Sequence, residues 1–125
     1  MHIDSPLLGT WRLLSYETWD AEGAVTQPCG MTPAGFAIFD TTGHAFIQLA
    51  RSSAEGSTVD EVAGSFTAYF GSLAINEAGT ELVITVEASN APSYVGSRQV
   101  RPFKIDGDRL VLGIPGQYRA TLRRA

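Results

Sequence analysis

Residues 8–17 read LGTWRLLSYE, a short run in which apolar and polar residues alternate after a glycine. Alternation with a period of two is typical of a strand with one buried face, and it places Trp11 and Leu13 on the same face. A tryptophan at the start of a strand is costly to leave in water and large enough to close a gap. We therefore predict that Trp11 fills one end of a small β-barrel whose interior is hollow.

The composition is that of an ordinary globular protein. The chain has 125 residues, of which 44% are hydrophobic, so we expect a single domain over residues 1–125. Its formal net charge of −4 argues against binding to nucleic acid, which needs a basic face. We find no secretory signal and no apolar run of membrane-spanning length. We therefore expect a cytoplasmic protein that does not insert into membranes.

The sequence offers no metal-binding pattern. Its single cysteine, Cys29, excludes an intrachain disulfide framework and a multi-cysteine zinc site. Of the two histidines, His2 lies at the terminus and His44 stands alone, so a histidine zinc site is not expected. We predict neither a metal nor another cofactor.

Short alternating segments recur along the chain, separated by turn residues such as DTTG at 40–43 and NEAG at 76–79. Eight such strands with short connections favour an all-β fold, closed into an antiparallel up-and-down barrel that leaves no sheet edge exposed. Residues 52–66 interrupt the pattern, and STVDEVAG within them predicts one short helix across a barrel mouth. Residues 19–34 form a second long connection that we expect to fold over the opening. The predicted strands are 10–18, 35–40, 44–50, 66–76, 81–88, 97–105, 109–114 and 118–124.

Strict alternation assigns side chains to the barrel interior. If Trp11 points inward, Ser15 and Glu17 do so too. Arg101 is the residue that we expect to anchor a ligand, because a buried guanidinium favours an acidic or carbonyl-bearing group. The alternative is an internal ion pair between Arg101 and Glu17. The predicted ligand-binding residues are Leu13, Ser15, Glu17, Phe46, Tyr69, Arg101, Phe103 and Tyr118.

The residues GTW near the start of the chain and an arginine near its end resemble the calycin pattern, which lipocalins and fatty-acid-binding proteins share. In that pattern an arginine of the last strand packs over a tryptophan of the first strand and closes the barrel. Face parity makes Arg124 the partner of Trp11, with Arg123 as the alternative. Where the pattern leads us to expect an aromatic residue close to this arginine, the sequence has Leu122.

Four longer segments are similar to the bacterial and fungal lipocalin-like domain family. They are LLGTWRLLSYE, GFAIFDTTGHAFIQL, FTAYFGSLAI and RQVRPFKIDGDRLVL, and they cover nearly half of the chain. The resemblance implies a calycin-like barrel that binds small hydrophobic molecules.

Three functions fit this reading. The preferred one is binding of a small hydrophobic molecule in the barrel cavity, in a secondary-metabolite pathway. The first alternative is a cofactor-independent isomerase, cyclase or hydratase for a polyketide- or terpenoid-like substrate, in which Glu17, His44 or Tyr69 moves a proton. The second is a filled barrel that acts by association with another protein or with itself as a homodimer. The sequence does not decide whether the protein is an enzyme.

Overall fold

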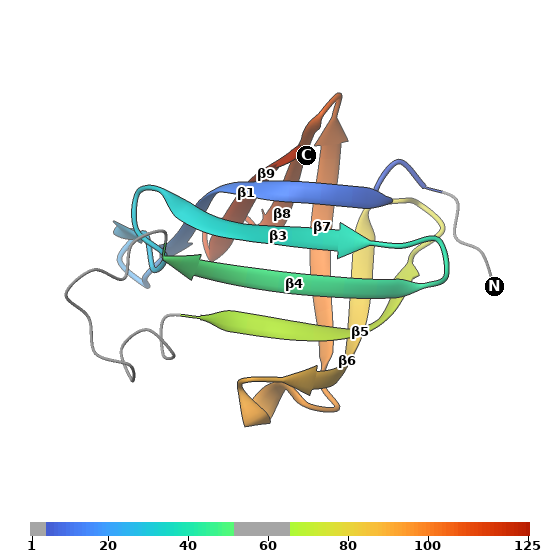
Figure 1. Ribbon diagram of the computed structural model, residues 1–125. Helices are drawn as coiled ribbons and strands as arrows, with labels where there is room; N and C mark the ends of the chain where they lie inside the picture. Colours follow the sequence, from blue (N-terminus) through green and yellow to red (C-terminus); the bar gives the residue numbers. More distant parts are fainter. Residues whose placement is uncertain (1–4, 52–65) are drawn as a thin grey trace.

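The computed structural model describes residues 5–51 and 66–125 and shows a closed antiparallel β-barrel (Figure 1). Each strand of the ring pairs with the next one along the chain, and β1 closes the ring by pairing with β9. The eight strands that the described residues contribute to this ring confirm the predicted up-and-down barrel. They are β1 (Gly9–Trp19), β3 (Pro33–Phe39), β4 (His44–Arg51), β5 (Thr67–Ile75), β6 (Glu81–Ser89), β7 (Arg98–Asp106), β8 (Arg109–Ile114) and β9 (Tyr118–Arg124).

The barrel is built as two layers that cross at a steep angle. In Figure 1, β1, β3, β4 and β5 run across the front, whereas β6 and β7 stand nearly upright behind them. Alternate side chains of the strands point into the space between the layers, as the period of two dictates. The core therefore lies inside the ring. Its largest fully buried side chains are Leu7, Trp11, Phe39, Leu82, Ile84, Leu110 and Leu122.

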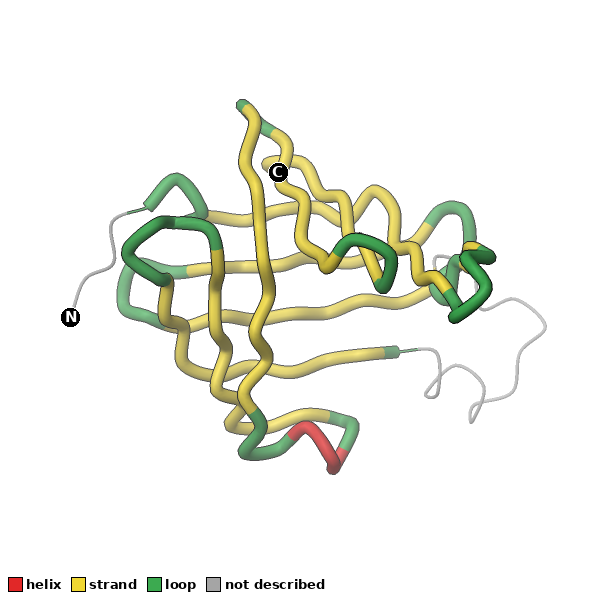
Figure 2. The backbone as a smooth tube through the Cα atoms, turned by 180° about the vertical axis from the view of Figure 1, so that it is seen from behind, coloured by secondary structure: helices red, strands yellow, loops and turns green. Residues whose placement is uncertain are grey.

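The two ends of the barrel have different connections, as the backbone trace in Figure 2 shows. Short turns at 40–43, 76–80 and 107–108 join strands at the end where β1 begins. At the other end, residues 20–32 contain the two-residue strand β2 (Val25–Thr26), which pairs with the end of β1. Residues 90–97, also at that end, contain the 3-10 helix η1 (Pro92–Tyr94), which the sequence pattern does not predict.

The helix predicted within residues 52–66 falls on residues 52–65, which lie outside the described part of the chain. In the part that is described, no helix has the length and apolar character needed to cross a membrane.

Trp11 lies at the end with the short turns and is fully buried. Its Nε1 donates a hydrogen bond of 2.8 Å to the carbonyl of Leu7, which is also fully buried. The Arg124 guanidinium lies over the indole, with Cζ 4.1 Å from the ring centroid. Arg124 also donates to the carbonyls of Pro6 and Leu8, at 2.7 and 2.8 Å. Tryptophan, arginine and the N-terminal segment together close this end of the barrel.

Candidate functional site

A cavity of about 350 Å³ lies inside the barrel and reaches the end with the longer connections. Pro28 and Cys29 from residues 20–32 and Tyr94 from η1 line it at that end. Its wall is mostly apolar and comes from both layers, because inward positions alternate along every strand. The wall includes Leu13, Ile47, Ile84, Leu112, Ala120 and Leu122.

Tyrosines supply most of the hydroxyl groups in the cavity. All four tyrosines of the sequence line it, namely Tyr16, Tyr69, Tyr94 and Tyr118. The rings of Tyr69 and Tyr94 meet edge to face, with centroids 5.4 Å apart. Burial raises the pKa of Tyr69 to about 12, although the Arg101 guanidinium opposes that rise. Burial also raises the pKa of Tyr16 and of Tyr118, so these phenols stay protonated at neutral pH and can donate hydrogen bonds.

Arg101 is the one charged side chain among the described residues that line the cavity. It is half-buried on β7, and its Cζ lies 5.4 Å from the centroid of the Tyr118 ring. Its Nη1 donates to the carbonyl of Val100 at 3.0 Å, and its Nη2 donates to Gln99 Oε1 at 2.5 Å. The alternative ion pair with Glu17 is not formed, because Glu17 pairs with Arg119 on the outer face, with 2.8 Å between Oε1 and Nη2.

A β-bulge changes the inner face of β1. The pairs Leu13–Leu122 and Ser15–Thr121 with β9 leave Leu14 as an extra residue between them. Beyond the bulge, Tyr16 and Thr18 line the cavity. The prediction that Ser15 and Glu17 point inward is therefore wrong, since the inserted residue moves every later side chain to the opposite face.

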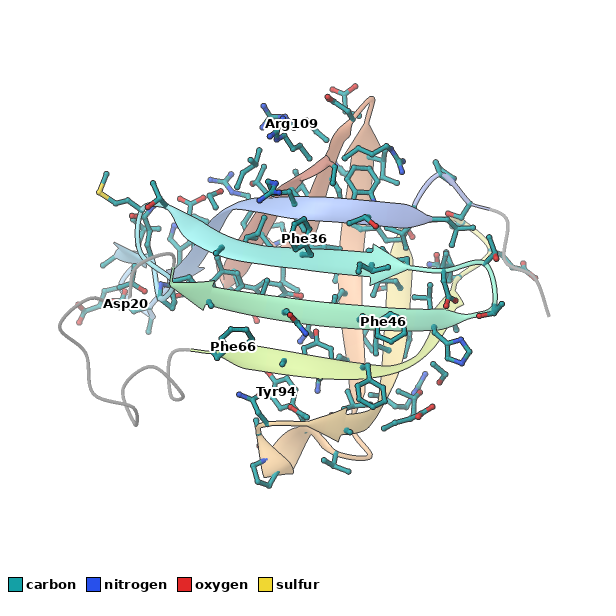
Figure 3. All side chains as sticks on the ribbon, in the orientation of Figure 1. Asp20, Phe36, Phe46, Phe66, Tyr94 and Arg109 are labelled. Atoms are coloured by element: carbon teal, nitrogen blue, oxygen red, sulfur yellow. The ribbon has the colours of Figure 1, made fainter. Side chains whose placement is uncertain are left out.

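Two predicted lining residues lie elsewhere. Phe46 is on the outer face of β4, where it is 42% exposed and stacks against Phe70 with centroids 6.2 Å apart (Figure 3). The residues that point inward from β4 are its neighbours in the alternation, such as Ile47. Phe103 is buried in the core but is not among the cavity-lining residues. Leu13, Tyr69, Arg101 and Tyr118 do line the cavity.

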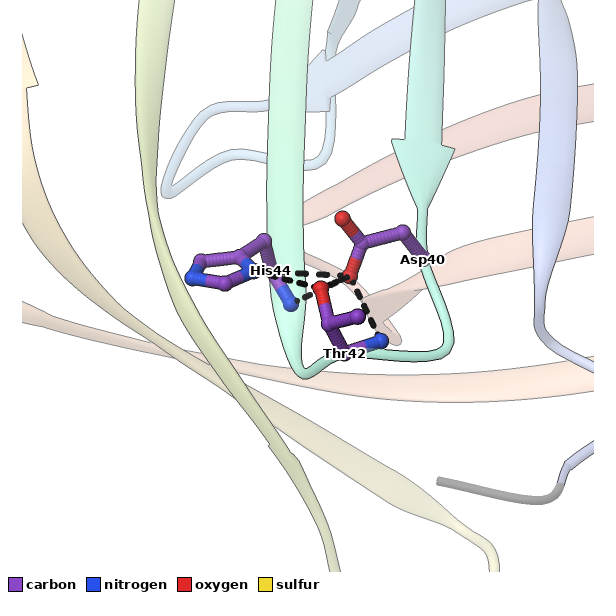
Figure 4. A network of polar contacts seen from close by, with 3 residues as sticks. All are labelled: Asp40, Thr42 and His44. Carbon is purple, nitrogen blue, oxygen red and sulfur yellow. Dashed lines mark hydrogen bonds and ion pairs between the residues drawn. The ribbon is translucent and has the colours of Figure 1, made fainter. Parts of the chain in front are cut away.

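His44 lies outside the cavity, on the outer face of β4 next to the 40–43 turn (Figure 4). Its Nδ1 is 2.8 Å from the Thr42 hydroxyl and 3.6 Å from Asp40 Oδ1. Asp40 Oδ1 accepts hydrogen bonds from the backbone N–H groups of Thr42 and His44, at 3.0 and 2.8 Å. This network holds a turn at the end opposite to the cavity mouth, so His44 is not placed to move a proton on a bound molecule.

The hydrogen bonds that Asp40 accepts predict that part of the free energy of unfolding depends on pH. Desolvation raises the pKa of Asp40, but the hydrogen bonds from His44 and Thr42 outweigh it and leave the pKa below 3.8. Because the pKa of this carboxyl is lower in the folded than in the unfolded state, its ionised form stabilises the fold at any pH above the unfolded-state pKa. This stabilisation is lost as the pH falls through the folded-state pKa.

Asp40→Asn is therefore expected to have a lower Tm than wild type at pH 7, with a difference that disappears in strongly acidic solution. Circular dichroism melts from neutral to strongly acidic pH measure this difference. Glu77→Gln removes a carboxylate from the exposed 76–80 turn and is expected to follow wild type throughout. A difference between Asp40→Asn and wild type that persists at the acidic limit would contradict the assignment.

Several lining residues were not predicted. Tyr16 and Thr18 were missed because the bulge has no clear signature in the sequence. Tyr94 and Cys29 were missed because they lie in connections, where alternation gives no direction. The tyrosines offered an indirect signal for the position of the site. The chain has four, all of them line the cavity, and assigning all four to the inner surface would have identified the site.

Comparison with known proteins identifies the family. Residues 8–121 match the family described as lipocalin-like domain. No curated protein matches the chain. Among solved structures, the lipoprotein YedD from Klebsiella pneumoniae is 14% identical with a TM-score of 0.52, over 99% of this chain and 75% of that one. An uncharacterized protein from Bacteroides eggerthii is 12% identical with a TM-score of 0.52, over 94% of this chain and 98% of that one.

These two likenesses concern the fold, and they agree with the eight-stranded ring described above. The family match spans most of the strands, from β1 into β9. The chain belongs to the family of lipocalin-like domains.

Proposed function

We propose that this protein binds a small hydrophobic molecule inside the barrel. The observation that carries the proposal is the cavity of about 350 Å³ with its mostly apolar wall, open toward one end. Pockets of this size and character bury most of the surface of a small ligand. Eight-stranded barrels are often filled by their own side chains, and the cavity favours binding over that alternative.

The enzyme alternative has less support from the site. Of its three proton-transfer candidates, Glu17 and His44 lie outside the cavity and Tyr69 lines it. Burial keeps the Tyr69 phenol protonated at neutral pH, since its pKa is about 12, which makes it a donor of hydrogen bonds and a poor base. Binding is therefore the function that the site supports best.

Filling the cavity from its own wall tests this function. Ala120 is buried on β9 and lines the cavity. In Ala120→Phe the larger side chain is therefore expected to fill the space that a ligand would occupy, and no buried side chain is removed. Decanol and decanoate are suitable probes, and saturation at about 100 times the dissociation constant would stabilise wild type by about 2.7 kcal/mol. The rise in Tm is expected in wild type and is expected to vanish in Ala120→Phe.

Thr121→Phe is the matched control, because Thr121 is the next residue of β9 and faces outward opposite Ser15. It is expected to keep the ligand-dependent rise in Tm. If neither probe raises the Tm of wild type, or if Ala120→Phe responds as wild type does, binding inside the barrel is the wrong function.

A further inference from the structure

Among the described residues, the cavity combines one positive charge with one buried hydroxyl that lacks a hydrogen-bond partner. A guanidinium has five N–H donors, and the two hydrogen bonds of Arg101 described above go to Val100 and Gln99. The Tyr118 hydroxyl is buried and has no hydrogen-bond partner within the described residues. Both residues line the cavity, and the Arg101 guanidinium lies over the ring of the same tyrosine. A buried polar group without a partner is unusual, and a ligand atom can satisfy it.

The charge balance of the cavity favours a monoanion. Apart from Arg101, the described lining residues are uncharged, and the carboxylate of Glu17 is paired with Arg119 on the outer face of the barrel. A guanidinium against an apolar wall is weakly screened, so an anion gains more there than in water. A phosphate monoester would bring a second negative charge that no other cation in the described lining neutralises.

Geometry favours a carboxylate among the monoanions. Its two oxygens lie in one plane and match parallel N–H groups of a guanidinium. Carboxylate oxygens have further lone pairs, so one of them can also accept a hydrogen bond from a phenol. Burial raises the pKa of Tyr118, which keeps the proton that such a bond needs.

The cavity volume limits the size of the ligand. Water occupies about 30 Å³ per molecule in the liquid. A cavity of about 350 Å³ therefore holds about a dozen groups of that size. Medium-chain and small aromatic acids match this number, whereas a long-chain fatty acid exceeds it.

We propose that the ligand is a monocarboxylic acid of about a dozen non-hydrogen atoms. Its carboxylate binds between the Arg101 guanidinium and the Tyr118 hydroxyl, and its apolar body lies against Leu13, Ile84 and Leu122. This inference rests on the proposed function and adds the head group, its two binding residues and the size.

Calorimetric titration with a matched pair of probes tests the head group. Decanoate and decanol have the same chain and differ in charge, and decanoate is expected to bind wild type about tenfold more tightly. Hexadecanoate, titrated below its micelle concentration, is expected to bind no more tightly than decanoate because its additional methylenes do not fit inside.

Three variants assign the preference to named groups. Arg101→Gln is expected to bind decanoate and decanol with similar affinity. Tyr118→Phe removes a single hydroxyl and keeps the ring. It is expected to lower the affinity for decanoate several-fold and to leave the affinity for decanol unchanged. Arg98→Gln removes an exposed charge from the same strand and is expected to keep the preference of wild type.

The outcomes separate this inference from the proposed function. Equal affinity of wild type for decanol and decanoate would overturn the carboxylate assignment, although the cavity would still be a binding site. A preference for decanoate that survives in both Arg101→Gln and Tyr118→Phe would also overturn it. If Arg101→Gln does not fold, the single-atom variant Tyr118→Phe decides alone. Tighter binding of hexadecanoate than of decanoate would overturn the size limit.

Discussion

Replacement of Trp11 by alanine is expected to destabilise the fold by about 3–5 kcal/mol. The indole is fully buried at the closed end of the barrel, in contact with Leu7 and beneath Arg124. Its loss creates a cavity and leaves the Leu7 carbonyl without its donor, and each of these costs free energy. Arg124 keeps its hydrogen bonds to Pro6 and Leu8 but no longer has an aromatic face beneath it.

Urea unfolding followed by circular dichroism measures this loss, which corresponds to a decrease in Tm of about 10–20 °C for a domain of this size. Trp19→Ala is the matched control, since Trp19 is partly exposed at the other end of β1 with Arg119 over its ring. The control is expected to lose about 1 kcal/mol. Equal losses in the two variants would show that Trp11 does not hold the closed end together.

The fold was predictable from the sequence because its determinants are local. Turn residues such as those at 40–43 and 76–79 mark the hairpins, and each alternating run between them forms one strand. The partner of Trp11 was also accessible, because β9 runs without a bulge from Tyr118 to Arg124 and parity then separates Arg124 from Arg123. Closure of the ring is favoured because pairing the first strand with the last leaves no unpaired backbone groups at a sheet edge.

The site was less predictable because it depends on small departures from regularity. Because Leu14 is an extra residue in β1, Tyr16 and Thr18 line the cavity in place of Ser15 and Glu17. No residue in LLSYE marks the position of this bulge. On β4 the bulkiest apolar side chain, Phe46, lies on the outer face and stacks on Phe70, while its neighbour Ile47 lines the cavity. Hydrophobicity alone therefore does not say which face is inside.

Gly71→Ala is the second substitution with a large expected effect. A Cβ at Gly71 would lie 1.9 Å from the carbonyl oxygen of Thr85 and 3.0 Å from Cα of Val86, both in the backbone of β6. The pairs Phe70–Ala88 and Gly71–Val86 leave Glu87 as an extra residue, so β6 bulges at the point where the front layer meets the upright strands (Figure 1). Glycine at such a corner lets two backbones approach more closely than any side chain allows.

Because the obstacle is backbone, relief requires the two strands to separate and to weaken their hydrogen bonds. We expect Gly71→Ala to lose about 3 kcal/mol, at the upper end of the usual cost of overpacking. Gly23→Ala is the control, since a Cβ there meets nothing within 4 Å and only the φ of +85° is unfavourable. The control is expected to lose about 1 kcal/mol, as a non-glycine residue in the left-handed region does. Urea unfolding of both variants measures the difference, and a cost at Gly71 no greater than at Gly23 would mean that the corner between β5 and β6 relaxes freely.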